Sequence, residues 1–445
     1  MKASAKQFYA KRIMHFTQYF KQAKFIAASE EYYFPYIRKK FFIDKAVKSA
    51  TLNVSVLGFC ELYLNNKKIT DDLYVTPLTQ YNTPNKEDSG VRGTDRFFED
   101  ELESTISVSQ FDVKDFLRTG DNVFGLIIAG GWYRSELDKH NGYRNFGKTK
   151  ACFNIEIVYN DGSTDNFYSD ENCKWFYSFL IRSGIFHEEQ DLTKEIKDFS
   201  AWNYCDSEWK SVKIVDTPDS KYVLNDCPPN RIIRYVKAKL VKITQSEIVY
   251  DMGENLTGFP IIKSSLPVGE KITVTHSEVL DEDGSVNEFH AYAQKTTFIT
   301  DGREEYNLRF TWHGFRYISI SSTACTDKLS CETVAVVHAN VENTSEFECD
   351  NEVINWLYKT YVRSQLTNYQ CGVPTDCPQI ERKGYTGDGQ LLCDAGMMLL
   401  MRKSYIKNGL TIFQTCKIVK QVLCIIPRRV LSAVREALPA GVAPL

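Results

Sequence analysis

The sequence lacks the features by which membrane proteins, secreted proteins and nucleic-acid-binding proteins are usually recognised. No stretch approaches the ~20 consecutive apolar residues that a membrane-spanning helix needs. The apolar residues of positions 1–20 never run long enough for the core of a signal peptide. With 54 basic and 57 acidic residues the net charge is −3, which provides no basic surface for a phosphate backbone. We therefore expect a cytoplasmic protein without nucleic-acid or membrane partners.

The cysteines and the short motifs give no sign of a disulfide framework, a metal site or a nucleotide cofactor. Thirteen cysteines are an odd number at irregular spacing, and none forms a CxxC pair. Such cysteines are typical of reduced thiols in a core, and a structural zinc site is not expected. The chain also contains no GxSxG, HExxH, P-loop or GxGxxG motif. We expect neither a cofactor nor a metal.

From about residue 35 to residue 340 the chain has the pattern of an all-β protein. Apolar and polar residues alternate, for example in 153–159. Asp-Gly pairs at 161–162 and 283–284 separate such runs, as hairpin turns do. Short strands with regular turns favour sandwiches, and about 300 residues are too many for one sandwich. We expect two sandwiches, joined within the proline-containing stretch 216–230.

In the last quarter of the chain the periodicity of the apolar residues becomes helical. Asp350 or Asn351 can cap a first helix, whose apolar face consists of Val353, Trp356, Leu357 and Thr360. Two more helical stretches are expected at about 390–401 and 412–423. Between the first two helices lies an irregular segment, residues 372–389, which is rich in proline, glycine and charge. We call it the acid loop and expect chemistry there.

The acid loop holds three carboxylates, one aromatic ring and one cation: Asp376, Glu381, Asp388, Tyr385 and Arg382. A glycosidase needs one carboxylic acid to protonate the departing oxygen and a second carboxylate to activate water or attack the sugar. Crowded like charges raise the pKa of one member, which suits a general acid near neutral pH. On composition alone the residues also fit a solvated acidic loop beside a helix N-terminus, where carboxylates are favourable anyway.

The residue order of 374–388, PTDCPQIERKGYTGD, resembles the catalytic signature of the bacterial α-L-rhamnosidases, glycoside hydrolase family 78. Three upstream segments are similar to other motifs of that family, in the same order: YDMGENLTGF (250–259), HSEVLDEDG (276–284) and FTWHGFRY (310–317). Residues 62–66 and 130–133 resemble its N-terminal accessory domain. The resemblance extends from about residue 35 to residue 401.

The resemblance implies an inverting hydrolase that removes terminal, non-reducing α-L-rhamnose from glycosides or polysaccharides, without a cofactor. Glu381 matches the family's general acid. Asp376 and Asp388 match carboxylates that hold the sugar hydroxyls, and Tyr385 stands where an aromatic residue, usually Trp, lines the sugar site. Arg382 follows the acid as in the family motif, as a further substrate-binding residue or as the partner of an aspartate.

Two features of the acid loop depart from the family pattern. Ile380 replaces a polar residue that usually precedes the acid. The spacing from Asp376 to Glu381 is one residue shorter than in the commonest form of the motif. Both departures preserve the side-chain types that the chemistry needs and affect only how the acid is tuned.

The implied fold is multidomain and mostly β: two jelly-roll-like β-sandwiches followed by the first helices of an (α/α)6 barrel. The expected divisions are an N-terminal segment (1–34), an accessory β-sandwich (35–220), a concanavalin-like second β-sandwich (221–341), the start of a six-hairpin glycosidase domain (342–410) and a divergent tail (411–445). Twelve barrel helices need roughly 200 residues or more, which exceeds the length of chain from position 342 onwards. We therefore expect a truncated or frameshifted gene, whose product lacks the family's downstream water-activating glutamate and turns over little substrate.

Two other functions fit the residues: a non-catalytic carbohydrate-binding protein, and a different (α/α)6 hydrolase acting on another sugar. His313 and Arg316 are candidate catalytic groups by residue type, but we expect that neighbours at a domain interface satisfy their hydrogen bonds. Trp132 and Tyr133 are expected either in a core or in an accessory carbohydrate groove. Residues 187–190 are expected to form an exposed turn. The sequence leaves the oligomeric state open, a homo-oligomer included.

Overall fold

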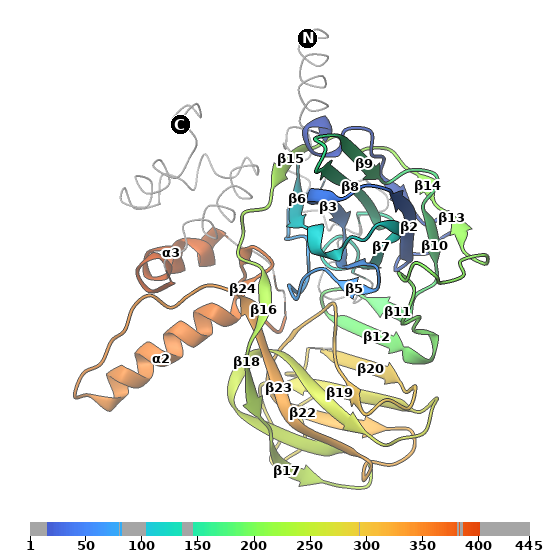
Figure 1. Cartoon of the computed structure of the whole chain (residues 1–445). Helices are drawn as coiled ribbons and strands as arrows, with labels where there is room; N and C mark the ends of the chain where they lie inside the picture. The colour runs from blue at the N-terminus through green and yellow to red at the C-terminus, as the bar shows by residue number, and fades with distance from the viewer. Residues whose placement is uncertain are drawn as a thin grey trace, which may run out of the picture.

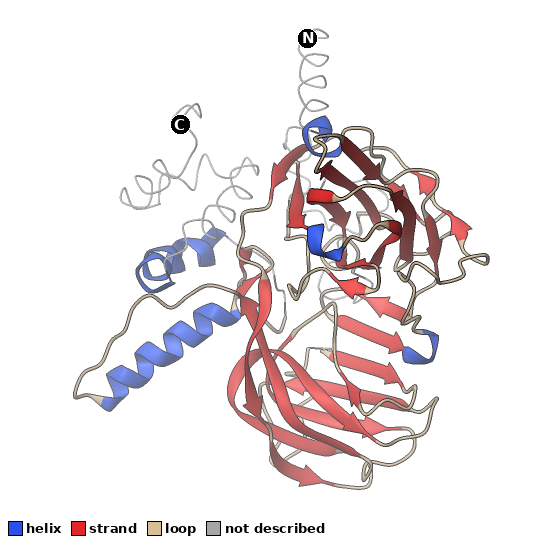
Figure 2. Ribbon diagram, in the orientation of Figure 1, coloured by secondary structure: helices blue, strands red, loops and turns tan. Residues whose placement is uncertain are grey.

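The computed structural model describes residues 16–79, 81, 104–135, 146–292, 294–380, 382 and 386–400. Two β-domains lie one above the other, and two helices lie to one side of them (Figure 1, Figure 2). The predicted architecture, mostly β with helices after the second β-domain, is confirmed. Neither of the two helices has the length and the apolar character that crossing a membrane requires.

In the described part of the chain, the first β-domain is a sandwich of a seven-stranded and a six-stranded sheet. The first sheet has the order β14-β1-β8-β3-β6-β15, with β9 also paired to β8, and the second has the order β13-β10-β2-β7-β4-β5. The strands are β1 Ile26–Ala27, β2 Tyr36–Ile43, β3 Val47–Leu57, β4 Phe59–Leu64, β5 Lys67–Lys68, β6 Thr105–Asp112, β7 Gly120–Ala129, β8 Lys150–Tyr159, β9 Thr164–Tyr168, β10 Lys174–Phe176, β13 Lys210–Ser211, β14 Lys213–Ile214 and β15 Lys221–Leu224. Two short 3-10 helices are η2 Lys114–Phe116 and η3 Leu192–Lys194.

The alternation of apolar residues explains this sandwich. In β8, Phe153 and Ile155 are buried between the two sheets, and β7 of the facing sheet contributes Phe124 and Leu126 to the same core. The turn from β8 to β9 runs through Gly162, which has a φ of 81°. Glycine adopts this left-handed conformation without steric cost, so the predicted hairpin turn is confirmed.

The second β-domain is a single curled sheet of ten strands, counted over the described residues. Its order is β11-β12-β20-β19-β22-β18-β23-β16, with β17 and β21 also paired to β18. The strands are β11 Leu180–Ser183, β12 His187–Asp191, β16 Asn230–Lys237, β17 Lys239–Ile243, β18 Ile248–Ser264, β19 Lys271–Ser277, β20 Lys295–Ile299, β21 Glu305–Tyr306, β22 His313–Ser322 and β23 Leu329–Ala339. The long β18 pairs with β22 along its first part and with β23 along its second part, so the sheet folds over onto itself (Figure 2).

Several strands cross the divisions that the sequence suggests. β11 and β12 precede residue 221, yet they extend the sheet of the second β-domain, where β12 runs parallel to β20. β1 lies within the first 34 residues and pairs with β8, whereas β15 begins at residue 221 and pairs with β6 of the first β-domain. Chain segments on both sides of positions 34 and 220 therefore contribute to the same sheets. The domain bounds stay a prediction.

The expectation of an exposed turn at residues 187–190 is wrong. These residues begin β12, and Glu188 and Gln190 are buried. The Glu188 carboxylate accepts hydrogen bonds from the backbone N–H groups of Arg309 (2.9 Å) and Phe310 (2.8 Å). Burial raises the pKa of Glu188 to about 7, and the two N–H groups act in the opposite direction. The carboxylate thus joins β12 to the segment before β22.

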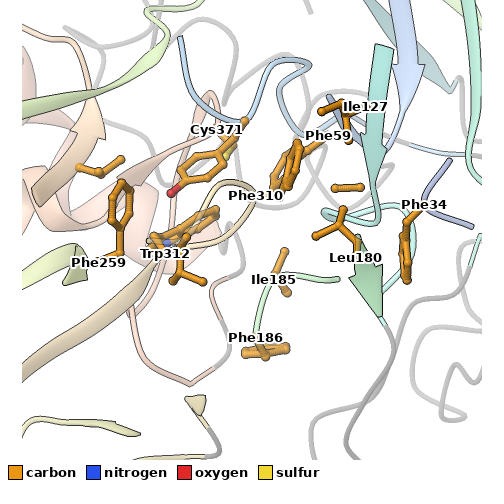
Figure 3. Close-up of a cluster of buried hydrophobic side chains, with 14 of the residues drawn as sticks. Phe34, Phe59, Ile127, Leu180, Ile185, Phe186, Phe259, Phe310, Trp312 and Cys371 are labelled. Carbon is orange, nitrogen blue, oxygen red and sulfur yellow. The ribbon is translucent and has the colours of Figure 1, made fainter. Parts of the chain in front are cut away.

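Apolar side chains from both β-domains form one shared core (Figure 3). Phe59 comes from β4 of the first β-domain, and Phe259 comes from β18 of the second. Trp312 lies between the two domains in this cluster, with its ring centroid 6.5 Å from that of Phe59 and 6.3 Å from that of Trp132. Trp132 and Tyr133 are 8% and 4% exposed. They are therefore core residues rather than the lining of a carbohydrate groove.

Two helices follow the second β-domain, α2 Glu352–Thr367 and α3 Thr386–Leu400. As predicted, Asn351 caps α2: its side chain accepts hydrogen bonds from the backbone N–H groups of Val353 and Ile354. α3 begins about four residues before the helical stretch expected at 390–401. The stretch expected at 412–423 lies outside the described residues.

The predicted apolar face of α2 is exposed along most of the helix. Val353, Trp356 and Leu357 are 63%, 60% and 53% exposed. Only the C-terminal half packs, where Val362 joins a small core with Val341 and other apolar residues. An apolar helix face of this kind normally packs against further structure.

Candidate active site

A short hairpin that reverses the chain after α2 leads into the acid loop. β24 Tyr369–Gln370 pairs with β25 Val373–Pro374, and Cys371 and Gly372 form the turn with φ values of 50° and 86°. After the hairpin, the backbone N–H of Thr375 donates to the carbonyl of Asn368 (2.8 Å). These local bonds direct the rest of the loop back towards the second β-domain.

Side-chain amides fix this hairpin to strands of the second β-domain. The buried Gln370 donates from Nε2 to Thr257 Oγ1 (3.1 Å) on β18 and to the carbonyl of Val337 (3.0 Å) on β23. The backbone N–H of Cys371 donates to Asn230 Oδ1 (2.8 Å) at the start of β16. Three strands therefore hold the hairpin that leads into the acid loop.

The middle of the acid loop packs directly on the backbone of β22. Pro378 lies so close to Gly314 that a Cβ added to the glycine would be 2.7 Å from the proline Cβ and 2.9 Å from its carbonyl carbon. Such distances do not occur between real Cβ atoms, so only glycine fits at position 314. The close approach of the acid loop thus explains why the FTWHGFRY segment has a glycine at position 314.

Arg382, the residue after Glu381 in sequence, is the strongest attachment of the acid loop. It is 0% exposed and has a φ of 51°. Its guanidinium donates to the carbonyl of Trp312 (2.5 Å), to Gln294 Oε1 (2.7 Å) and to His313 Nδ1 (3.2 Å). A further hydrogen bond goes to the carbonyl of Ile185, in the connection between β11 and β12. Segments from three distant parts of the chain thus converge on one side chain.

The partners of Arg382 correct the expectation that it pairs with an aspartate. Among the described residues, its guanidinium bonds to two carbonyls, one amide and one imidazole, all of them neutral. Burial lowers the pKa of the guanidinium to about 9, while Cys377 and Tyr74 act in the opposite direction. A fully buried guanidinium with these partners positions the loop, and this geometry gives no support to the expected contact with sugar.

The acceptors of Arg382 are themselves held in place. Gln294 Oε1 also accepts from the backbone N–H of Gly314 (2.9 Å), and Gln294 Nε2 donates to the carbonyl of Gly314 (2.8 Å). His313 Nε2 lies 3.0 Å from Thr296 Oγ1. Gly314 therefore serves the acid loop twice, by admitting Pro378 and by orienting the amide that receives Arg382.

Two adjacent, mutually tilted imidazoles support the groups that hold Arg382. The rings of His276 and His313 lie 4.0 Å apart, both side chains are 0% exposed, and His276 Nδ1 lies 3.0 Å from the carbonyl of Gln294. Burial lowers the pKa of His276 to about 3, and burial together with His276 and Arg382 holds the pKa of His313 well below its usual range. His313 is therefore neutral near pH 7, and only a neutral imidazole can accept the hydrogen bond from Arg382.

Neighbours satisfy both His313 and Arg316 as predicted, but the partner of Arg316 lies within the second β-domain rather than at a domain interface. His313 is held between Arg382 and Thr296, and the Arg316 guanidinium forms a two-pronged ion pair with Asp251 at 2.8 and 2.9 Å. Arg316 is therefore a structural residue that joins β22 to β18.

The two described carboxylates of the acid loop, Asp376 and Asp388, lie towards its two ends. Asp376 is half-buried and accepts a hydrogen bond from Cys377 Sγ (3.5 Å). Asp388 is half-buried in the first turn of α3, where the helix dipole favours a negative charge. Glu381 and Tyr385 lie outside the described residues, and the roles of all four stay predictions. Within the described part of the chain no three His, Cys, Asp or Glu side chains are grouped to hold a metal ion.

Sequence reasoning missed two of the four residues that accept hydrogen bonds from Arg382. Trp312, His313 and Gly314 lie in a segment that the family resemblance picks out. Gln294 and Ile185 carry no such signal, because their role depends on which distant strands pair.

Comparisons with known proteins match three family models in order along the chain. They are the α-L-rhamnosidase N-terminal domain (residues 96–234), the bacterial α-L-rhamnosidase concanavalin-like domain (241–340) and the bacterial α-L-rhamnosidase 6 hairpin glycosidase domain (342–417). These matches begin before β6 and extend beyond α3, so β1 to β5 of the first β-domain precede them.

Relatives and solved structures agree with the family models. The chain is 27% identical over 376 residues to an α-L-rhamnosidase of Alteromonas sp. (strain LOR), a match over 82% of this chain and 38% of the relative. It is similar to the α-L-rhamnosidase structures from Dictyoglumus thermophilum (28% identity) and Aspergillus terreus (25% identity), each with a TM-score of 0.73 over 87% of this chain and 44% of the other. The chain thus spans less than half of the length of these relatives.

The contact between Pro378 and Gly314 predicts that Gly314→Ala destabilises the protein. The added methyl group must displace the acid loop or the strand, which typically costs about 1–3 kcal/mol. Urea unfolding followed by tryptophan fluorescence measures the loss. Ser321→Ala, on the half-buried outer part of the same strand, is the control and should change stability by less than about 0.5 kcal/mol. A Gly314→Ala protein as stable as the wild type would show that the loop does not rest on β22.

The buried imidazoles predict that stability falls as the pH falls below about 6.5. The unfolded chain protonates His276 at its ordinary pKa of about 6.5, whereas the folded chain resists protonation until about pH 3. Protons therefore favour the unfolded state between these values, and His276 alone accounts for roughly 2 kcal/mol between pH 7 and pH 5. Urea unfolding at both pH values should show this loss reduced by that amount in His276→Gln. Equal losses in both proteins would contradict a neutral His276.

Proposed function

The chain belongs to the bacterial α-L-rhamnosidases, and from this we propose that it carries the proton-donating part of an inverting active site. The proposed reaction is hydrolysis of terminal, non-reducing α-L-rhamnose from glycosides or polysaccharides. Rhamnose-bearing glycans are accordingly the proposed partners. The observation that carries this proposal is the attachment of the acid loop to the second β-domain.

A proton donor in glycoside hydrolysis must be held close to the departing oxygen. Misplacement of a catalytic group by about 1 Å can cost 100-fold in rate, so its supporting residues must be fixed. Pro378 precedes Glu381 by three residues and rests on Gly314, and Arg382 follows it directly and is locked in the interface. A solvated acidic loop, the alternative explanation, has no need for a buried guanidinium with four acceptors.

The remaining residues take roles that the family resemblance suggests. Glu381 donates the proton, Asp376 and Asp388 hold sugar hydroxyls, and Tyr385 lines the sugar site. Arg382 is proposed as a positioning residue in place of its expected role in substrate binding. An inverting reaction also needs a carboxylate that activates water on the opposite face of the sugar, which the family resemblance places downstream of the acid loop.

The proposal includes a cytoplasmic location. The side chains of ten cysteines are described, and all ten are free thiols. Five of them are buried: Cys60, Cys152, Cys173, Cys331 and Cys371. Free thiols of this kind are typical of a reducing compartment.

A chimera tests the role of Glu381 most directly. Residues 1–400 are joined to the part of the Alteromonas relative that lies beyond its matching segment, and hydrolysis of 4-nitrophenyl α-L-rhamnoside is measured. Glu381→Gln should lower kcat at least 100-fold, since general acid catalysis typically contributes about 10²–10⁴-fold. The product anomer, followed by NMR, should show inversion.

The matched control is Glu282→Gln, which changes an exposed glutamate in a turn of the second β-domain. Its kcat should equal that of the unmodified chimera. Wild-type rates in Glu381→Gln would remove Glu381 from its proposed role, and an active chimera that retains the anomer would reject the inverting mechanism.

A further inference from the structure

A polar pocket lies where the first β-domain meets the second. It has a volume of about 760 Å³, and its walls come from β4 and β5, from β16 and β18, and from residues 307–309. None of the described residues of the acid loop lines it. Its size is within the range of small-molecule sites, roughly 300–1,000 Å³. The pocket is therefore a separate feature of the domain interface with room for a ligand.

The floor of the pocket is a fixed ion network. The buried Glu61 accepts hydrogen bonds from Lys68 Nζ (2.9 Å), from the Tyr63 hydroxyl (2.8 Å) and from Arg309. Arg309 also donates to Glu195 (2.5 Å) and to the Tyr63 hydroxyl (3.0 Å). These groups bond to one another. The floor thus offers a shaped polar surface and no free nucleophile, which suits binding rather than catalysis.

The rim of the pocket combines an exposed aromatic ring with polar side chains. Tyr235 and Ile232 on β16 line the pocket and are 59% and 37% exposed. Asp71 and Asn307 are exposed at the same pocket, and Lys68 is half-exposed. A tyrosine ring supplies a flat apolar face with a polar tip, and the neighbouring groups supply donors and acceptors. This combination suits a ring that has an apolar C–H face and hydroxyls at its edge.

The charges of the pocket are nearly balanced. Its lining includes the cations Lys68, Arg231 and Arg309 and the carboxylates Glu61 and Asp71. Arg231 is in addition paired with Asp72 at 2.7 Å. A strongly charged ligand therefore gains little from this pocket, whereas a neutral, hydroxyl-rich ligand finds partners of both kinds.

Strand β16 connects this pocket to the acid loop. Asn230, whose side chain holds Cys371 directly before the acid loop, lies five residues before Tyr235 on the same strand. Because of a β-bulge between Ile232 and Arg234, the two positions lie opposite Ala339 and Ala335 of β23, four residues or roughly 13 Å apart along the strand. A short oligosaccharide spans this distance, whereas a single sugar does not.

We propose that this pocket is a carbohydrate subsite that binds a neutral sugar unit of the glycan whose terminal rhamnose reaches the acid loop. The sugar ring stacks on Tyr235, and its hydroxyls bond to Lys68, Asp71 and Asn307. The inference rests on the proposed function and extends it to a substrate class: oligosaccharides rather than rhamnosides of small aglycones.

Calorimetric titration of the 445-residue chain with a neutral rhamnose-terminated tetrasaccharide and with free L-rhamnose tests the subsite. Tyr235→Ala should weaken binding of the tetrasaccharide at least fivefold and leave binding of L-rhamnose unchanged. Tyr235→Phe keeps the ring and should keep the affinity. Ile243→Ala, at an exposed apolar position on neighbouring β17, is the matched control. Asp388→Asn changes the acid-loop site and should weaken binding of both sugars. Urea unfolding verifies that each variant is folded.

The outcomes separate the subsite from the proposed activity. Unchanged tetrasaccharide affinity in Tyr235→Ala, or no binding by the wild type at 10 mM, overturns the subsite and leaves the role of Glu381 to the chimera assay. Tighter binding of tetragalacturonate than of the neutral tetrasaccharide also overturns it, because the pocket would then select an anion. A Tyr235-dependent affinity together with an inactive chimera upholds the subsite and rejects the hydrolase.

Discussion

The buried guanidinium of Arg382 is the constraint on which the arrangement of the acid loop depends. Placing an unpaired cation out of water costs several kcal/mol unless hydrogen-bond acceptors are already in place. Here four neutral acceptors are supplied by the β11–β12 connection, by Gln294 and by the segment of Trp312 and His313. The loop can adopt this conformation only when all of these segments are assembled. The acid loop is therefore held in this position only when both β-domains are folded and in contact.

This constraint explains why two strands from the first half of the chain belong to the sheet of the second β-domain. β11 and β12 leave the first half of the chain and join the sheet of the second β-domain, beside β20. Their connection carries the carbonyl of Ile185 to Arg382, and β12 carries Glu188 to the backbone of residues 309 and 310. The same interface contains the ion network of Glu61 and Arg309 and the apolar core around Trp312. An accessory domain that supplies such contacts is part of the support of the candidate site.

Much of the fold follows from local patterns in the sequence. The alternation in β8, the glycine turn after it and the cap at Asn351 are set by neighbours within a few residues, and sequence reasoning predicts them. The acid loop is recognisable because its motif is contiguous. The burial of Glu188, the core position of Trp132 and the partners of Arg382 depend on pairing between strands more than 100 residues apart in sequence, as the bonds of Arg382 to Ile185 and of Arg309 to Glu188 show. Charged residues are rarely buried, so composition points to solvent for Glu188 and Arg382.

The anchoring role of Arg382 is tested most directly by amide hydrogen exchange. Exchange in the acid loop and in the hairpin before it is compared between Arg382→Met and the wild type. Methionine fills a similar apolar volume but cannot donate to the four acceptors. The anchoring role predicts that the amides of Cys371 and Thr375, which donate hydrogen bonds in the wild type, exchange at least about tenfold faster in the variant, a loss of roughly 1.4 kcal/mol of local stability. Amides of β8 in the first β-domain should exchange as before. Unchanged protection of the acid loop in a folded variant would contradict the central role of Arg382.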